Sequence, residues 1–191
     1  MMIRLSSTIA LALFVQGCMP AKQAQSPQKT PQSQTDDGMA NQTLKDIGAS
    51  RLIVARGSSQ LSLADIARQN SAQLTVFQFS GTDCIPCRSE SPHVGQALAK
   101  YGSKIARVVI FPNAPTEYPE SAYLDFTRQY ANNSPYVTEI DSSAPVLKTI
   151  RASRSQFFGL YVLVNQQGLG QVLNMDHAYL KVDEAVAAAL K

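Results

Sequence analysis

Two cysteines separated by two residues are the strongest chemical signal in this sequence. They stand in the run Cys84-Ile85-Pro86-Cys87. Two thiols at this spacing can close a small disulfide ring, and the thiolate is the nucleophile in thiol–disulfide exchange. The pattern therefore predicts a redox pair in which Cys84 is the exposed nucleophile and Cys87 resolves the mixed disulfide.

A strand and a helix are expected to position this pair. Residues 74–79 form a nearly continuous apolar run with the length of a buried strand. After the motif, apolar residues recur at helical spacing: Val94, Ala97, Leu98 and Tyr101. Cys84 would then lie at a helix N-terminus, where free backbone N–H groups and the helix dipole lower a thiol pKa from about 8.5 to between roughly 3.5 and 7.5. Pro86 suits the first helical turn because it lacks an N–H and fixes φ.

The rest of the chain alternates strand-like and helix-like segments. Apolar runs predict strands at residues 51–55, 74–79, 105–111 and 160–164, with a turn at 166–168 leading into a further strand at 171–173. Helical periodicity is found at residues 61–68, after the motif, at 120–130 and at 182–190. This alternation predicts an α/β domain of three layers, in which helices flank a mixed central sheet.

The residues around the cysteines resemble a known family. The run Cys84-Ile85-Pro86-Cys87-Arg88-Ser89-Glu90-Ser91-Pro92 is close to the C-x-P-C-R-x-E-x-P of the TlpA/ResA-like thiol–disulfide oxidoreductases, within the thioredoxin superfamily. Residues 163–168 are similar to that family's LID-x-x-G turn. The resemblance implies a thioredoxin-like three-layer fold, with Cys84, Cys87, Pro86 and Glu90 as site residues. It also implies that Glu90 lies beneath the pair and influences the thiol pKa values, whereas the alternative for Glu90 is an exposed helix carboxylate.

The sequence also departs from the family pattern. Asp83 precedes the first cysteine where these proteins commonly have Trp, and its negative charge opposes a neighbouring thiolate. Gln78 stands where thioredoxin has a buried acid. No proline follows Pro145, so Gly159 or a neighbour within 157–160 would take the place of the superfamily's cis-proline. These departures bear on substrate handling and on redox competence.

Other functions of the same cysteines remain open. One is a purely structural disulfide, although so small a ring constrains few unfolded conformations. A zinc site would need more ligands than His93 and His177 provide, and both are interpreted as ordinary helix or loop residues. A Cu(I) chaperone is a third alternative, because soft thiolates suit Cu(I), but Sco-like chaperones have one more residue between their cysteines.

A binding or assembly factor with a thioredoxin fold is a further alternative. Residues 112–140 are rich in tyrosine, and such side chains could form either a partner surface or part of the core. The tyrosines are Tyr118, Tyr123, Tyr130 and Tyr136.

The N-terminal segment is predicted to be an export signal with a lipid attachment site. Residues 9–15 form an apolar run that is too short to span a membrane, which takes about 20 apolar residues. The run Val15-Gln16-Gly17-Cys18 resembles the lipobox of bacterial lipoproteins, in which the cysteine is diacylated, whereas the alternative is an ordinary signal peptide. By resemblance to the lipoprotein sorting rule, Met19 favours the outer membrane over the inner one. The predicted organisation is a signal peptide at 1–17, a lipidated N-terminus and disordered tether at 18–42, and a thioredoxin-like domain at 43–191.

Composition excludes several classes of function. The 191 residues include 17 basic and 14 acidic side chains, and the net charge of +3 is too small and scattered for a nucleic-acid footprint. The apolar fraction of 45% is ordinary for a soluble domain and argues against wholesale disorder or several membrane spans. The sequence thus predicts a membrane-anchored periplasmic thiol–disulfide oxidoreductase that acts as a reductase, without a cofactor or bound metal. Its partners would be exported protein thiols and disulfides and a redox partner protein.

Overall fold

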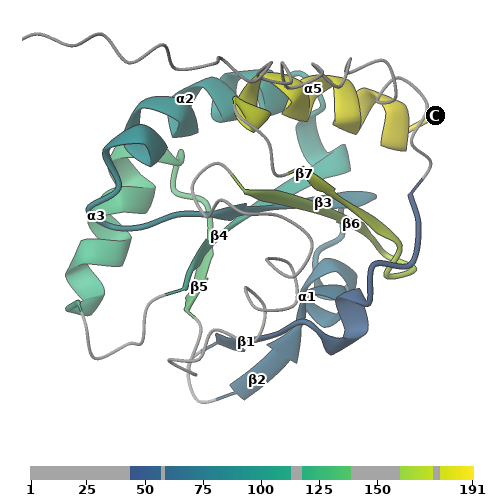
Figure 1. Ribbon diagram of the computed structural model, residues 1–191, viewed down its shortest axis with the longest axis horizontal. Helices are drawn as coiled ribbons and strands as arrows, with labels where there is room; N and C mark the ends of the chain where they lie inside the picture. Colours follow the sequence, from purple (N-terminus) through teal and green to yellow (C-terminus); the bar gives the residue numbers. More distant parts are fainter. Residues whose placement is uncertain (1–43, 57–58, 113–117, 139–159, 174–176) are drawn as a thin grey trace, which may run out of the picture. The chain divides into compact units, whose positions relative to one another are not determined.

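The computed structural model describes residues 44–56, 59–112, 118–138, 160–173 and 177–191 (Figure 1). The expected signal peptide, Cys18 and the tether lie outside these residues. So do residues 157–159 of the region 157–160 that is expected in place of the cis-proline, whereas Leu160 directly precedes β6. The elements in chain order are η1 (Ala49–Arg51), β1 (Ile53–Arg56), β2 (Ser59–Ser62), α1 (Leu63–Gln69), β3 (Leu74–Phe79), α2 (Ile85–Ala99), η2 (Gly102–Lys104), β4 (Ile105–Phe111), α3 (Glu120–Tyr130), β5 (Tyr136–Thr138), β6 (Tyr161–Asn165), β7 (Gly170–Leu173) and α5 (Ala178–Ala189).

A mixed sheet forms the central layer. Its strands lie in the order β2-β1-β5-β4-β3-β6-β7. β3 pairs in parallel with β4 and antiparallel with β6, while β4 pairs in parallel with β5. The outer pairs, β1 with β2 and β6 with β7, are antiparallel. The mixed strand directions expected from the sequence are therefore confirmed.

Helices cover both faces of this sheet (Figure 1). One face, which we call the α1 face, packs on α1 through residues that include Phe77, Phe79, Val108 and Ile110. The other, which we call the α2 face, packs on α2, α3 and α5 through residues that include Val76, Val109 and Leu163. Successive residues of a strand point to opposite faces, so a run such as 74–79 is buried throughout. The predicted three-layer arrangement is confirmed.

The strands β2 and β5 were not expected from the sequence. β2 has the sequence Ser-Gln-Leu-Ser, and β5 is a short strand at Tyr136–Thr138, so neither shows the apolar run of a central strand. The expected helix at 61–68 is partly wrong, because Leu61 and Ser62 belong to β2 and the helix begins at Leu63. Ser62 ends the strand and caps the helix, since its side chain accepts a hydrogen bond from the Asp65 backbone N–H at 3.0 Å.

Helix α2 carries the cysteine motif. Cys84 is its N-cap, Pro86 lies in its first turn, and the helix continues through Pro92 to Ala99. Its buried side chains follow the periodicity of one helix face: Cys87, Ser91, Val94, Gly95 and Leu98. In the described part of the chain, no helix combines the length and the apolar character that crossing a membrane requires.

Candidate redox site

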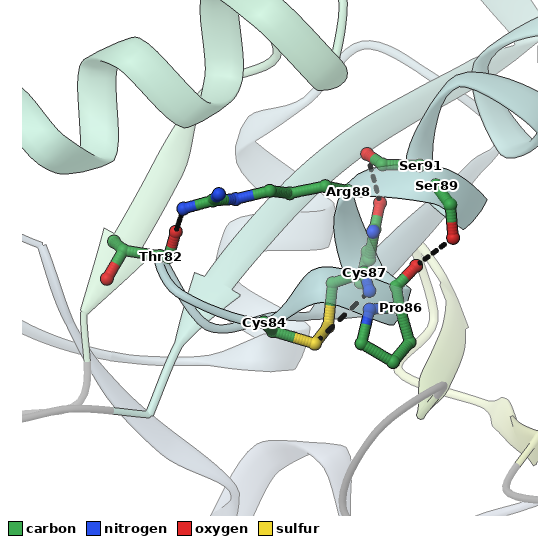
Figure 2. Close-up of a disulfide and its surroundings, with 8 residues drawn as sticks. Thr82, Cys84, Pro86, Cys87, Arg88, Ser89 and Ser91 are labelled. Carbon is green, nitrogen blue, oxygen red and sulfur yellow. Dashed lines mark hydrogen bonds between the residues drawn. A yellow bond between two sulfur atoms is a disulfide. The ribbon is translucent and has the colours of Figure 1, made fainter.

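Cys84 and Cys87 form a disulfide at the start of α2 (Figure 2). The S–S distance is 2.04 Å and the Cα atoms are 5.3 Å apart. The predicted pairing of these two thiols is thus present in the structure. The helix N-terminus predicted for Cys84 is confirmed as well.

The helix start also provides a hydrogen bond to the first sulfur. The Cys87 backbone N–H donates to Cys84 Sγ at 3.1 Å (Figure 2). When the disulfide is reduced, the same N–H and the positive end of the helix dipole would face a Cys84 thiolate. Both interactions favour the charged sulfur over the thiol, which is the condition for a reactive cysteine.

The loop between β3 and α2 is held by hydrogen bonds from both sides. The Ser80 N–H donates to the Ile110 carbonyl at 2.9 Å, and the Cys84 N–H donates to the Gly81 carbonyl at 3.2 Å. Arg88 reaches back from α2 and donates from Nη2 to the Thr82 carbonyl at 2.5 Å (Figure 2). These bonds fix the position of Cys84 relative to the end of β3.

The expectation of an exposed Cys84 is wrong for the disulfide form. Cys84 is 5% exposed and Cys87 is 2% exposed. Both pack in a cluster of mainly aromatic side chains, which we call the aromatic cluster: Val109, Phe111, Tyr118, Tyr123, Phe126, Tyr130, Ala131 and Tyr136. Of the tyrosines that could have formed a partner surface, Tyr123 is buried beside the disulfide, and the others pack against this cluster half-buried: Tyr118, Tyr130 and Tyr136.

The solvent side of the motif has a different character. Ile85 is 77% exposed, and it has the largest exposed fraction of any large apolar side chain in the described residues. Asp83 is exposed too, and the Tyr118 hydroxyl donates to its carboxylate at 3.1 Å. An exposed apolar side chain and an exposed carboxylate thus flank Cys84 on the solvent side.

A group of polar side chains lies on the other side of α2, between the helix and the sheet. This polar cluster consists of Gln78 of β3, Ser91 of α2 and Arg107 of β4. Arg107 donates from Nη2 to the Ser91 carbonyl at 2.9 Å and to Ser91 Oγ at 2.6 Å. It also donates from Nε to Gln78 Oε1 at 3.2 Å, and its Nη2 contacts the same oxygen. Gln78 and Ser91 are buried, with exposed fractions of 1% and 0%.

Arg107 is an unusual residue for this layer. Burial lowers the pKa of its guanidinium to about 10, which leaves it charged at neutral pH. Its Nη1 has no hydrogen-bond partner within the described ranges. Gly95 of α2 lies beside this guanidinium, and a Cβ there would lie 3.2 Å from Nη1 and 2.7 Å from Asn132 Nδ2.

Glu90 lies on α2, one turn beyond Cys87, and is half-buried. Desolvation raises the pKa of its carboxyl above the usual value, and His177 at the start of α5 lowers it in part. Its negative charge also helps to raise the pKa of the Tyr161 phenol, whose main cause is burial. The surroundings of Glu90 thus differ from those of a free surface carboxylate, and its influence on the thiols stays a prediction.

The two histidines lie on α2 and at the start of α5. His93 is exposed on α2, and His177 is the N-cap of α5 with φ of 59°. Their rings both lie near Tyr179, at centroid distances of 6.0 and 6.1 Å. Within the part of the chain that the structure describes, no group of three or more His, Cys, Asp and Glu side chains could hold a metal. The two sulfurs, once reduced, are the soft ligands that this site could offer to a metal such as Cu(I).

The fold was compared with known proteins. No protein-family model matches the sequence, and no curated protein matches it either. DsbF of MTB (Mycobacterium tuberculosis) is similar in structure, with a TM-score of 0.52 and 16% identity over 75% of this chain and 98% of that chain. Yeast Sco1 is similar with a TM-score of 0.53 and 13% identity over 77% of this chain and 90% of that chain. These likenesses show that the chain has a thioredoxin-like fold, as the sequence motif implied.

The sequence reasoning missed the polar cluster as a unit. The family pattern marks Gln78 only as the place of a missing acid, and Arg107 belongs to no motif. The signal was present, because Arg107 is the one charged residue of the otherwise apolar run 105–111, and Gln78 interrupts the apolar run 74–79. Polar residues at such positions in buried strands need partners, and here they are partners of each other.

Proposed function

From this fold and site, we propose that the protein is a thiol–disulfide oxidoreductase that acts through Cys84 and Cys87 on other exported proteins. One observation carries the proposal. The two cysteines form a disulfide at the N-terminus of α2, and a backbone N–H donates to the sulfur of the first. This arrangement stabilises the thiolate that exchange requires, and a purely structural disulfide would not need it.

The chemistry is a two-step transfer of two electrons. In the reduced protein, the Cys84 thiolate attacks one sulfur of a substrate disulfide and forms a mixed disulfide, and the released substrate sulfur takes up a proton. Cys87 then loses its proton and attacks Cys84 Sγ, which re-forms the Cys84–Cys87 disulfide and releases the second substrate sulfur as a thiol. The substrate gains two electrons and two protons, and the protein's dithiol loses them. A partner protein dithiol restores the reduced pair, and no organic cofactor takes part.

Position in the helix supports this assignment of roles. Cys87 lies inside α2, whereas Cys84 is the N-cap residue and its sulfur accepts the Cys87 N–H. Cys84 is also flanked by Ile85, which offers an apolar contact to a partner. We propose reduction of substrates as the direction, on the strength of the sequence resemblance around the motif.

The proposed location is the periplasmic face of a membrane, with the outer membrane favoured. The lipobox-like run before Cys18 supports this proposal, since two or more acyl chains anchor a protein stably. Replacing Cys18 with alanine should release the full-length protein from the membrane fraction. Unchanged partitioning of that variant would remove the lipid anchor from the proposal and leave the exchange chemistry standing.

A trapping experiment tests the proposed exchange. In the Cys87→Ser variant, a substrate joined to Cys84 can no longer be released, so mixed disulfides should accumulate in cells and disappear on treatment with a reductant. Cys84→Ser is the matched control, because it keeps one motif cysteine but removes the attacking sulfur, and it should trap far less. Equal trapping by both variants, or none by either, would contradict the assignment. An empty trap combined with tight Cu(I) binding to the reduced pair would favour a copper chaperone instead.

A further inference from the structure

The polar cluster beneath α2 places a positive charge on the inner side of the redox pair. Arg107 belongs to the α2 face of the sheet, because it lies two residues before Val109, which packs with both cysteines. Its guanidinium donates to the side chain and the carbonyl of Ser91. Ser91 follows Cys87 by four residues, which places the two on the same face of α2, one turn apart. The charge therefore lies one helical turn and one hydrogen bond away from the buried Cys87 sulfur.

No carboxylate neutralises this charge in the described part of the chain. The ion pairs found there join other groups, and all of these are at least 40% exposed. The partners of Arg107 are the neutral side chain of Gln78 and the neutral groups of Ser91. The titratable group that faces it from β6 is Tyr161, whose phenol is kept protonated because burial raises its pKa.

We propose that Arg107 tunes the redox pair by stabilising the thiolate that forms when the Cys84–Cys87 disulfide is reduced. The disulfide is uncharged, so the guanidinium interacts more favourably with the reduced pair than with the oxidised one. Reduction by a thiol such as glutathione adds two electrons and up to two protons to the pair, and one proton is left off when a thiolate remains. Stabilising that thiolate makes the disulfide easier to reduce. This inference rests on the proposed function, and it assigns Arg107 a long-range electrostatic role without contact to the substrate.

Other charges around the pair oppose or support this effect. Asp83 next to Cys84 disfavours a thiolate, whereas Arg88 and the helix dipole favour it. Asp83 and Arg88 are exposed, so water and salt screen them. Arg107 is half-buried and its Nη1 is shielded from solvent, so its charge is screened less. Glu90 is half-buried, and it interacts electrostatically with His177 and with the Tyr161 phenol. We therefore expect Arg107 to be the dominant side-chain charge.

The size of the effect follows from Coulomb's law. One helical turn plus the hydrogen bond to Ser91 gives a separation on the order of 10 Å between the guanidinium and the Cys87 sulfur. At that distance, with an effective dielectric constant of about 20, a unit charge changes an ionisation equilibrium by roughly tenfold. Removing the charge should therefore lower the equilibrium constant for reduction of the disulfide by about tenfold, which corresponds to about 30 mV for a two-electron couple.

The test compares full-length variants equilibrated in glutathione redox buffers. The redox state of Cys84 and Cys87 is read by alkylation and peptide mass spectrometry, so that Cys18 does not contribute. Arg107→Met removes the charge and keeps the length of the side chain, and Arg107→Lys keeps the charge. Gln78→Glu leaves Arg107 in place and gives it a carboxylate partner. Arg128→Met is the matched control, because Arg128 is an exposed arginine on α3.

Charge tuning predicts a specific order of the variants. Arg107→Met and Gln78→Glu should both lower the equilibrium constant for reduction by about tenfold, while Arg107→Lys and Arg128→Met should stay within about threefold of the parent protein. The pH at which the thiolate absorbance appears in the ultraviolet should rise in the first two variants only. If Arg107→Met fails to fold, Arg107→Gln takes its place, since it also removes the charge but keeps groups that can hydrogen-bond to Ser91 and Gln78.

Two results would overturn the inference. One is an unchanged equilibrium constant in Arg107→Met, and the other is an equal loss in Arg107→Lys and Arg107→Met, which would point to shape in place of charge. Both results are distinct from a failure of the proposed function. In that case the parent protein itself would show no reversible exchange with glutathione.

Discussion

The two faces of the central sheet are built from the same strands but have different contents. The α1 face is aliphatic and aromatic, with Phe77, Val108 and Val162 among its buried side chains. The α2 face holds the disulfide and the polar cluster in the midst of apolar residues. Phe77 and Gln78 are neighbours in the chain, as are Val108 and Arg107, and each pair is divided between the two faces.

This division shows how a strand can serve stability and chemistry at once. Alternation sends every second side chain to the opposite face, so a polar residue on one side leaves the apolar layer on the other side complete. The α1 face can then bury apolar side chains without constraints from the site. The α2 face carries the desolvated charge and the reactive sulfurs, whose cost in stability the rest of the fold must offset.

The largest expected effect comes from breaking the α1 face. Phe77 is fully buried there, and Phe77→Ala removes its contacts with α1 and leaves a cavity. We expect a loss of about 3–5 kcal/mol in the free energy of unfolding, measured by urea denaturation. The reduction equilibrium of the cysteine pair should not change by more than about twofold, because no charge near it is altered. A shift as large as that of Arg107→Met would contradict the separation of the two faces.

The second-largest effect is expected from Arg107→Met on the α2 face. Its effect on the free energy of unfolding should not have the sign of that of Phe77→Ala. Arg107→Met replaces a desolvated charge by an apolar side chain, and Ser91 Oγ can still donate to Gln78 Oε1, from which it is 3.4 Å away. The free energy of unfolding should stay the same or rise by about 1–2 kcal/mol, although the redox equilibrium shifts. A loss of more than about 2 kcal/mol in urea denaturation would mean that the polar cluster is primarily structural.

A smaller effect on stability is expected at the start of α1, the helix that covers the α1 face. Ser62→Ala removes the N-cap, where the hydroxyl donates to the Asp65 carboxylate at 2.6 Å and accepts from its N–H at 3.0 Å. The loss should be about 1 kcal/mol at pH 7. The Ser62 hydroxyl is the main cause that lowers the pKa of Asp65, so this stabilisation is present above the unfolded pKa near 3.8 and is lost as pH falls through the lower folded pKa. Urea denaturation of the parent protein and of Ser62→Ala at several pH values checks this. An equal loss in the free energy of unfolding at pH 7 and in acid would contradict the prediction.

The smallest effect concerns Glu90 on the α2 face. Its folded pKa is raised by desolvation, so the folded state binds more protons than the unfolded state over the interval between the two pKa values. Stability from this carboxyl is therefore present below about pH 4.5 and is lost as pH rises through the folded pKa. Glu90→Gln should gain stability relative to the parent protein from pH 4 to pH 7. Thermal unfolding measures the difference in stability between Glu90→Gln and the parent protein. If that difference is the same at every pH in this range, Glu90 is not desolvated.

Much of the fold could be predicted from the sequence, because its central strands are continuous apolar runs. Residues 74–79 and 105–111 match β3 and β4, and residues 120–130 match α3. β2 and β5 could not be predicted in this way, since they owe their pairing to neighbouring strands and not to an apolar pattern of their own. Tertiary context decides the conformation of such short segments.

Only those features of the candidate site that come from one continuous stretch of sequence could be predicted. The spacing of the cysteines and the position of Pro86 place both sulfurs at a helix start, and the structure agrees. The burial of Cys84 depends on the aromatic cluster, whose members come from β4, from α3 and the residues next to it, and from β5, and meet only in the folded protein. The contact between Arg107 and Ser91 likewise joins β4 to α2, so no local pattern reveals it.

The central claim is that Cys84 and Cys87 exchange electrons with other thiols. The most direct test is the equilibrium of the full-length protein in glutathione buffers of increasing reducing strength, followed by alkylation at the two cysteines. We predict a reversible two-electron transition with a midpoint between about −270 and −120 mV, the range from thioredoxin to DsbA. A pair that stays oxidised in every buffer, or that does not re-form its disulfide after reduction, would contradict the claim.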